Sequence, residues 1–106
     1  MLVGLERFDL RIPGCRSLKE KRHVIKGLTG AIRSTFEASV AEVDHQDLWQ
    51  RAAIGVAVVG NQEFHVRAVM GKIESLVEAW GGVEVLSAGL SIHEPEGPSA
   101  SRGPLP

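Results

Sequence analysis

The chain has 106 residues, 43% of them hydrophobic, and a formal net charge of −1. This length fits one domain, and the hydrophobic content is sufficient for a core of its own. No basic leader precedes a small-residue cleavage site and no apolar run approaches ~18 residues, so we expect a cytoplasmic protein and no membrane partner. The single cysteine, Cys15, cannot form an internal disulfide and has no CxxC partner for a metal, which fits a reducing compartment.

Basic side chains are concentrated in the first third of the chain. Residues 1–35 carry eight basic and three acidic side chains, a net charge of +5, whereas the remainder carries four basic and ten acidic side chains, a net −6. Segregation of this kind can create a local positive field on a molecule with no overall attraction for polyanions. A solvated helix face is the alternative interpretation of the same charges.

The sequence predicts six elements in the order strand, helix, strand, strand, helix, strand. Ser17 and Glu20 form a capping box that marks the start of the first helix, and Asn61 is expected to be the N-cap of the second. The segment from Pro95 onward is rich in Pro, Gly and Ser without periodicity, so we expect a disordered tail at 95–106 after a domain at 1–94. The expected strands are 1–12, 39–44, 52–60 and 83–93, and the expected helices are 18–36 and 62–80.

This element order matches the split βαβ, ferredoxin-like pattern, an α+β sandwich. Right-handed crossovers place both helices on one face of a four-stranded antiparallel sheet, with the first and third strands in the centre. The other sheet face would be too apolar for a simple water-facing surface, and either a second copy of the chain or a ligand would cover it. The residues expected on that face include Val3, Leu5, Ala53, Gly55 and Ala57, beside Arg7 and Arg11.

The first helix combines a packing face with a separate basic stripe. At about 100° per residue, Lys19, Arg22, Lys26 and Arg33 fall together and apart from the apolar positions. Their spacing of i, i+3, i+7 and i+14 lets the charged groups follow a phosphate backbone over about 20 Å. Lys21 points toward the packing side, and we expect its stem to lie over the edge of the core with the ammonium in water.

The loop Arg11–Ser17 leads into the start of this helix. Backbone N–H groups and the helix dipole favour an anion there, and Arg11 and Arg16 flank the position. Acylphosphatases share the predicted topology and bind phosphate in the corresponding loop, although no matching catalytic motif is present here.

Residues 42–51 form a dense polar cluster around a tryptophan. The segment has one histidine and several carboxylates but lacks the second nitrogen that a metal site usually contains, so neither a metal nor a cofactor is expected. Trp49 either anchors the loop against the core or provides a stacking platform for a base. Arg51 either contacts a nucleic acid or caps the local backbone.

Two stretches are the most distinctive, RIPGCRSLKEKRHVIKGL and SVAEVDHQDLWQRAAIGVAVVGN. Together they resemble the YlxP-like family of small bacterial proteins, a domain of unknown function. The similarity covers about residues 1–93, and SLKEKR and AEV-HQDLWQRA are its most specific parts. The resemblance implies a ferredoxin-like fold, a cytosolic location and a gene neighbourhood shared with translation initiation and ribosome-binding factors, but no established activity.

These observations predict a non-enzymatic RNA- or ribosome-associated accessory protein that binds phosphates without DNA specificity. The sheet lacks the exposed aromatic pairs of an RRM, so stacking across it is not expected. Two alternatives stay open: a structural or regulatory homo-oligomer, for example a homodimer, paired through the open sheet face, and an acylphosphatase-like small-phosphate enzyme. The residues expected to contact nucleic acid are Arg11, Arg16, Lys19, Lys21, Arg22, Lys26, Arg33, Trp49 and Arg51.

Overall fold

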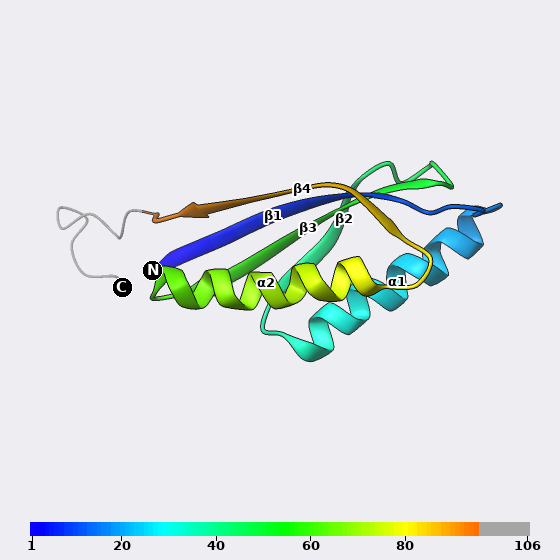
Figure 1. Ribbon diagram of the computed structural model, residues 1–106. Helices are drawn as coiled ribbons and strands as arrows, with labels where there is room; N and C mark the ends of the chain where they lie inside the picture. Colours follow the sequence, from blue (N-terminus) through cyan, green and yellow to red (C-terminus); the bar gives the residue numbers. More distant parts are fainter. Residues whose placement is uncertain (96–106) are drawn as a thin grey trace, which may run out of the picture.

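The computed structural model describes residues 1–95 and has the predicted α+β arrangement. Every helix and strand begins and ends within one residue of the predicted position. Two helices cover one face of a four-stranded sheet (Figure 1). The predicted tail lies, from residue 96 onward, outside the described residues. The strands are β1 (Leu2–Arg11), β2 (Ser39–Asp44), β3 (Arg51–Gly60) and β4 (Glu84–His93), and the helices are α1 (Leu18–Thr35) and α2 (Glu63–Ala79).

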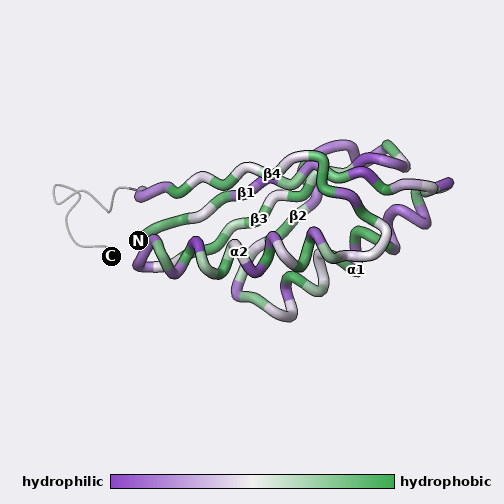
Figure 2. Tube along the Cα trace, viewed as in Figure 1, coloured by the Kyte–Doolittle hydropathy of each residue, from purple (hydrophilic) through white to green (hydrophobic). Residues whose placement is uncertain are grey.

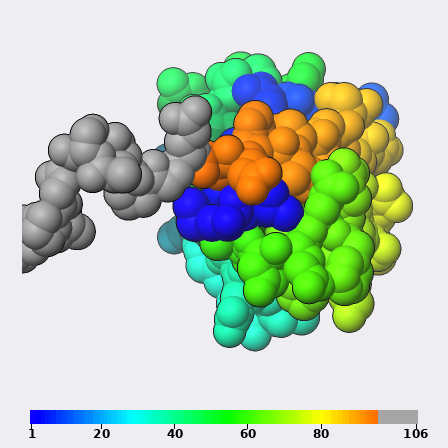
Figure 3. All heavy atoms as spheres, turned by 90° about the vertical axis from the view of Figure 1, so that its left-hand side faces the viewer, coloured from blue at the N-terminus to red at the C-terminus, as the bar shows by residue number. Residues whose placement is uncertain are grey.

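The sheet is antiparallel throughout, and its strand order is β2-β3-β1-β4. This order confirms the prediction that the first and third strands lie in the centre and establishes a ferredoxin-like βαββαβ fold. β1 and β3 pair along their full length, from Leu2 opposite Gly60 to Arg11 opposite Arg51. In the end-on view, β4 lies directly against the N-terminal residues of β1 (Figure 3).

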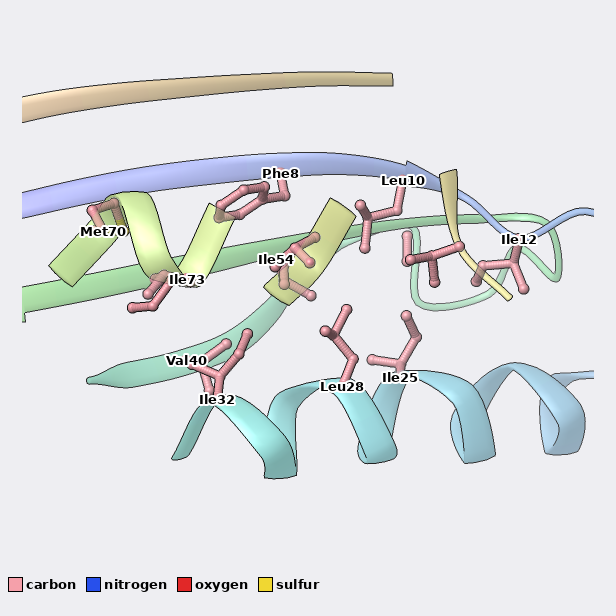
Figure 4. Packing of buried hydrophobic residues seen from close by; sticks show 14 of the residues in the cluster. Phe8, Leu10, Ile12, Ile25, Leu28, Ile32, Val40, Ile54, Met70 and Ile73 are labelled. Atoms are coloured by element: carbon pink, nitrogen blue, oxygen red, sulfur yellow. The ribbon is translucent and has the colours of Figure 1, made fainter. Parts of the chain in front are cut away.

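The core lies between the sheet and the two helices. Phe8 and Leu10 of β1 and Ile54 of β3 point toward the helices, which meet them with Leu28 of α1 and Met70 of α2 (Figure 4). All five side chains are at most 1% exposed. Burial of this apolar area is the main source of stability, at roughly 25 cal/mol per Å² removed from water.

α2 approaches the sheet closely because two strand residues there have no side chain. A Cβ on Gly4 would lie 2.6 Å from Val66 Cγ1, and one on Gly60 would lie 2.7 Å from Val66 Cγ2. Both distances are shorter than real carbon contacts, so the glycines make room for Val66 at the start of α2. Val66 is completely buried as a result.

The two helix starts differ in how they are capped. The capping box of α1 is confirmed, because the backbone N–H of Glu20 donates to Ser17 Oγ (3.1 Å) and the N–H of Arg16 donates to the Glu20 carboxylate (2.8 Å). The expected Asn61 cap of α2 is wrong. Gln62 occupies the N-cap position and makes no side-chain capping hydrogen bond, since the helix begins one residue later than the sequence suggests.

One carboxylate lies inside the core. Glu6 is on the helix-facing side of β1, its side chain is almost inaccessible at 4% exposure, and its Oε1 accepts no hydrogen bond from the described residues. Burial raises the pKa of Glu6 to about 7, and repulsion from the Glu74 carboxylate of α2 adds to the effect.

Within residues 1–95 no helix is both long enough and apolar enough to cross a membrane.

Candidate nucleic-acid interface

The basic stripe of α1 lies on the surface of the folded protein. Lys19, Arg22, Lys26 and Arg33 are all exposed, and we call them the basic ridge. Among the described residues, none of the four lies within 4.0 Å of a carboxylate oxygen. Figure 2 shows hydrophilic residues gathered in the first turns of α1. The ridge therefore presents positive charge that acidic side chains of residues 1–95 do not pair.

Arg33 connects the end of the ridge to the sheet. Its Nη2 donates to the carbonyl oxygen of Val40 in β2 at 2.7 Å. This bond fixes one nitrogen of the guanidinium, and the fork geometry of arginine leaves further N–H groups for an anion. Arg33 is thus a positioned cation rather than a mobile one.

A cleft separates α1 from β2 and the β2–β3 loop, and we call it the α1 cleft. Its volume is ≈ 580 Å³. Arg22, Lys26 and Arg33 of the basic ridge line the α1 side, with Ile25 and Thr29 between them. Three polar residues line the opposite side, namely Glu42, Gln46 and Asp47. The cleft therefore has a cationic wall and a wall rich in hydrogen-bond acceptors.

The structure places the Lys21 ammonium differently from the sequence prediction. We expected its ammonium in water, but the side chain is 2% exposed. Its Nζ donates to the carbonyl oxygen of His45 and lies 3.4 Å from Glu42 Oε2. The β2–β3 loop closes over the side chain, so Lys21 holds that loop against α1 and does not form part of an exposed phosphate-binding surface.

The β2–β3 loop is fixed at several points. His45 adopts a left-handed backbone conformation (φ 62°), its N–H donates to Asp44 Oδ1, and its carbonyl accepts from Lys21. At the other end of the loop, Gln50 Nε2 donates to the carbonyl of Cys15 at 3.2 Å, and the Gln50 carbonyl accepts from the N–H of Ile12 at 3.0 Å. The acceptor wall of the α1 cleft is thereby held in position.

Arg11 and Arg51 do not join the basic ridge. They are cross-strand partners at the ends of β1 and β3, and strand alternation places both side chains on the face opposite the helices. Arg11 forms an exposed ion pair with Glu84 (2.8 Å). Arg51 is half-buried, and its Nε has no hydrogen-bond partner among the described residues. The sequence grouped these residues with α1, but the sheet separates them.

The loop before α1 uses part of its hydrogen-bonding capacity to cap the helix. The capping box already engages the N–H groups of Arg16 and Glu20, and the N–H of Lys21 donates to the Ser17 carbonyl. Arg16 itself is exposed. Arg16 thus continues the row of exposed cations toward the start of α1.

Trp49 lies in the β2–β3 loop and is 50% exposed, and its neighbour Leu48 is 49% exposed. The side chain is therefore not anchored in the core, and part of the ring stays in contact with solvent. Its exposed area is available to a partner, including a base that stacks on it.

The open sheet face carries a shallow apolar hollow of ≈ 360 Å³. Gly55 and Ala57 of β3 lie at its floor, and the larger exposed side chains beside it are Leu5 and Val43. The sequence correctly predicted an apolar character for this face. It did not predict the hollow, which exists because small residues on neighbouring strands lie side by side.

Charges next to the hollow are paired with one another. Arg7 donates to both Asp9 and Asp44, at 3.0 and 3.3 Å. The hydrogen bond from Arg7 lowers the pKa of Asp9, and the hydrogen bond from the His45 N–H, followed by Arg7, lowers the pKa of Asp44. In the described part of the chain, no group of three or more His, Cys, Asp and Glu side chains could hold a metal ion.

Comparison with known proteins places the chain in a family. Residues 3–89 match the family model described as protein of unknown function (DUF503). The chain is 26% identical over 83 residues to the uncharacterized protein YlxP of Bacillus subtilis (strain 168), covering 78% of this chain and 90% of that protein. A de novo designed protein with a ferredoxin fold, solved by solution NMR, aligns with a TM-score of 0.47 and 10% identity over 94% of this chain and 89% of the other. The family match spans most of the chain and confirms the resemblance noted in the sequence, so the chain belongs to the DUF503, YlxP-like family of proteins of unknown function.

Proposed function

We propose that this protein is a non-enzymatic RNA- or ribosome-associated accessory protein, cytoplasmic, that binds the phosphate backbone through α1. The observation that carries the proposal is the basic ridge, whose exposed cations are not paired with carboxylates of the described residues. An unpaired Lys or Arg side chain can bind a phosphate and release the counterion that was bound there. This counterion release is the main source of sequence-independent affinity for nucleic acids. Arg16 extends the ridge toward the start of the helix.

The fixed geometry of the region supports the same function. Lys21 and Arg33 tie α1 to the β2–β3 loop and to β2, so the helix that carries the ridge is already in place before binding. Ordering of flexible side chains and loops is one of the costs of association. A helix that is already in place therefore lets its cations retain more of their electrostatic attraction as affinity.

Charge reversal on the ridge tests the proposal. We expect the Arg22→Glu, Lys26→Glu double variant to bind structured ribosomal RNA at least about tenfold more weakly than the wild type, because two attractive contacts become repulsive. Fluorescence anisotropy measures the affinity. Wild-type binding should also weaken by about 10²-fold between 50 and 200 mM salt if about four phosphates are contacted.

A double variant on the other helix is the matched control. Arg67 and Lys72 of α2 are exposed, and Arg67→Glu, Lys72→Glu changes the net charge by the same amount. This control should lose much less affinity than the ridge variant. Equal losses in both variants would show a response to net charge alone and would remove the assignment to α1.

Pairing of two copies through the open sheet face is a second candidate function. It is favoured by the apolar hollow beside Leu5 and Val43. A second copy is the proposed occupant because Arg7, Asp9 and Asp44 are already paired with one another, so two identical faces bring little unbalanced charge together. We expect sedimentation at low micromolar concentration to show a dimer for the wild type and a monomer for Leu5→Lys. A monomeric wild type would remove this candidate.

A further inference from the structure

The acceptor wall of the α1 cleft is not explained by binding to phosphates alone. Glu42 and Asp47 are acidic, and carboxylates repel a phosphate that approaches the basic ridge on the other side of the cleft. Glu42 is accounted for by its contact with the buried Lys21 ammonium, but a surface that only followed the RNA backbone would have no use for Asp47. The two walls therefore suit a ligand that is anionic at one end and a hydrogen-bond donor at the other.

The acceptors differ in how far the protein itself satisfies them. Glu42 lies 3.4 Å from Lys21 Nζ, and its buried Oε2 accepts no hydrogen bond from the described residues. Asp47 is exposed and forms no ion pair within residues 1–95. Gln46 is exposed beside it and can both donate and accept. Asp47 is thus the acceptor most available to a ligand.

A single nucleotide has the required distribution of groups. Its phosphate is anionic, and its base presents donors on the Watson–Crick edge when it is unpaired and unstacked. The volume of ≈ 580 Å³ lies in the range of about 300–1,000 Å³ that small-ligand sites occupy. Between the cations, the α1 side is formed by Ile25 and Thr29, both of which are buried, so the nucleotide is contacted mainly by the charged and polar side chains of the two walls.

We infer that the α1 cleft binds one unstacked nucleotide of the RNA, with its phosphate on the basic ridge and its base edge on Asp47 and Gln46. This inference rests on the proposed function, because the rest of the RNA is held by the ridge. Guanine is the preferred base. Its adjacent N1–H and N2–H groups can donate in parallel to the two oxygens of one carboxylate, whereas uracil has a single donor between two acceptors that a carboxylate repels.

The test uses four RNA hairpins with identical stems and one varied loop nucleotide. We expect the wild type to bind the guanine hairpin about tenfold more tightly than the uracil hairpin, with adenine and cytosine between them. Asp47→Asn should remove the preference for guanine. It should leave the affinity for the uracil hairpin unchanged or slightly higher, because a negative charge next to the phosphate is removed.

A second acidic residue provides the control for the change in charge. Glu37 is exposed in the α1–β2 connection and does not line the cleft, so Glu37→Gln should keep the full preference for guanine. A preference for guanine that persists in Asp47→Asn would overturn the inference, since the base would then be recognised elsewhere.

The two proposals fail in different ways. Equal affinity for all four hairpins, combined with a steep salt dependence, would overturn the nucleotide site and leave the phosphate-binding function in place. Absence of salt-dependent binding to every hairpin would overturn both. Tighter binding of the uracil hairpin would contradict the assignment of Asp47 as the acceptor for the base.

Discussion

Replacing Lys21 by methionine is expected to lower the free energy of unfolding by roughly 2–4 kcal/mol, the largest effect that we predict for a single polar side chain here. The ammonium is buried, donates to the His45 carbonyl and lies 3.4 Å from Glu42 Oε2. Methionine fills similar space but leaves both oxygens without their cation. Breaking a fully buried ion pair costs about 3–5 kcal/mol. We expect a smaller loss here because the Glu42 side chain is 24% exposed, so water can partly solvate its carboxylate.

Urea unfolding followed by circular dichroism measures this loss. Lys19→Met is the control, because Lys19 is exposed on the same helix and its replacement should change stability by no more than about 0.5 kcal/mol. Adding Glu42→Gln to Lys21→Met should recover part of the loss, since the uncompensated charge disappears. A Lys21→Met protein as stable as the wild type would mean that the ammonium does not hold the β2–β3 loop.

Replacing Glu6 by glutamine is expected to stabilise the protein at pH 8 by at most about 3 kcal/mol and to have little effect near pH 4.5. The side chain is buried on β1, and its pKa in the folded protein is raised from 4.5 to about 7. The folded state therefore binds a proton more tightly than the unfolded state. The contribution of Glu6 to stability is complete below pH 4.5 and is lost as the pH rises toward and through 7, where the buried group becomes ionised.

Thermal unfolding between pH 4.5 and 8 shows the effect. For a domain of this size 1 kcal/mol corresponds to about 4–8 °C, so the difference in Tm between Glu6→Gln and the wild type should widen by several degrees across this range. Glu74→Gln should produce a smaller change in the same direction, because it removes only the repulsion. Glu78→Gln, at an exposed position of α2, is the control. Parallel pH profiles for Glu6→Gln and the wild type would show that Glu6 titrates normally.

Both predictions concern charged side chains whose environments the sequence did not reveal. Glu6 lies on the helix-facing side of β1 with the other buried positions of that strand, and Lys21 lies on the packing side of α1, as helical periodicity predicts. Periodicity gives the direction of a side chain relative to its own element. It does not give the depth of the side chain or the group opposite it, which for Lys21 is a carbonyl 24 residues further along the chain.

The same distinction applies to the candidate site. The exposure of the basic ridge followed from α1 alone, because a capped amphipathic helix with cations at i, i+3, i+7 and i+14 can show them only on one side. The acceptor wall was visible as a polar segment in the β2–β3 loop. The sequence did not show that this segment lies opposite the ridge, because that position depends on how the loop closes over Lys21.

The sequence by itself determined the order and topology of the elements, and their bounds to within one residue. Local signals such as the Ser17–Glu20 capping box mark where elements begin, and the handedness of crossovers leaves one arrangement of four strands. Only the tertiary structure decided which charges are buried, which are paired and which meet across a cleft. Such contacts join residues far apart in the chain, and no local pattern encodes the small differences in distance that separate a buried ion pair from a solvated side chain.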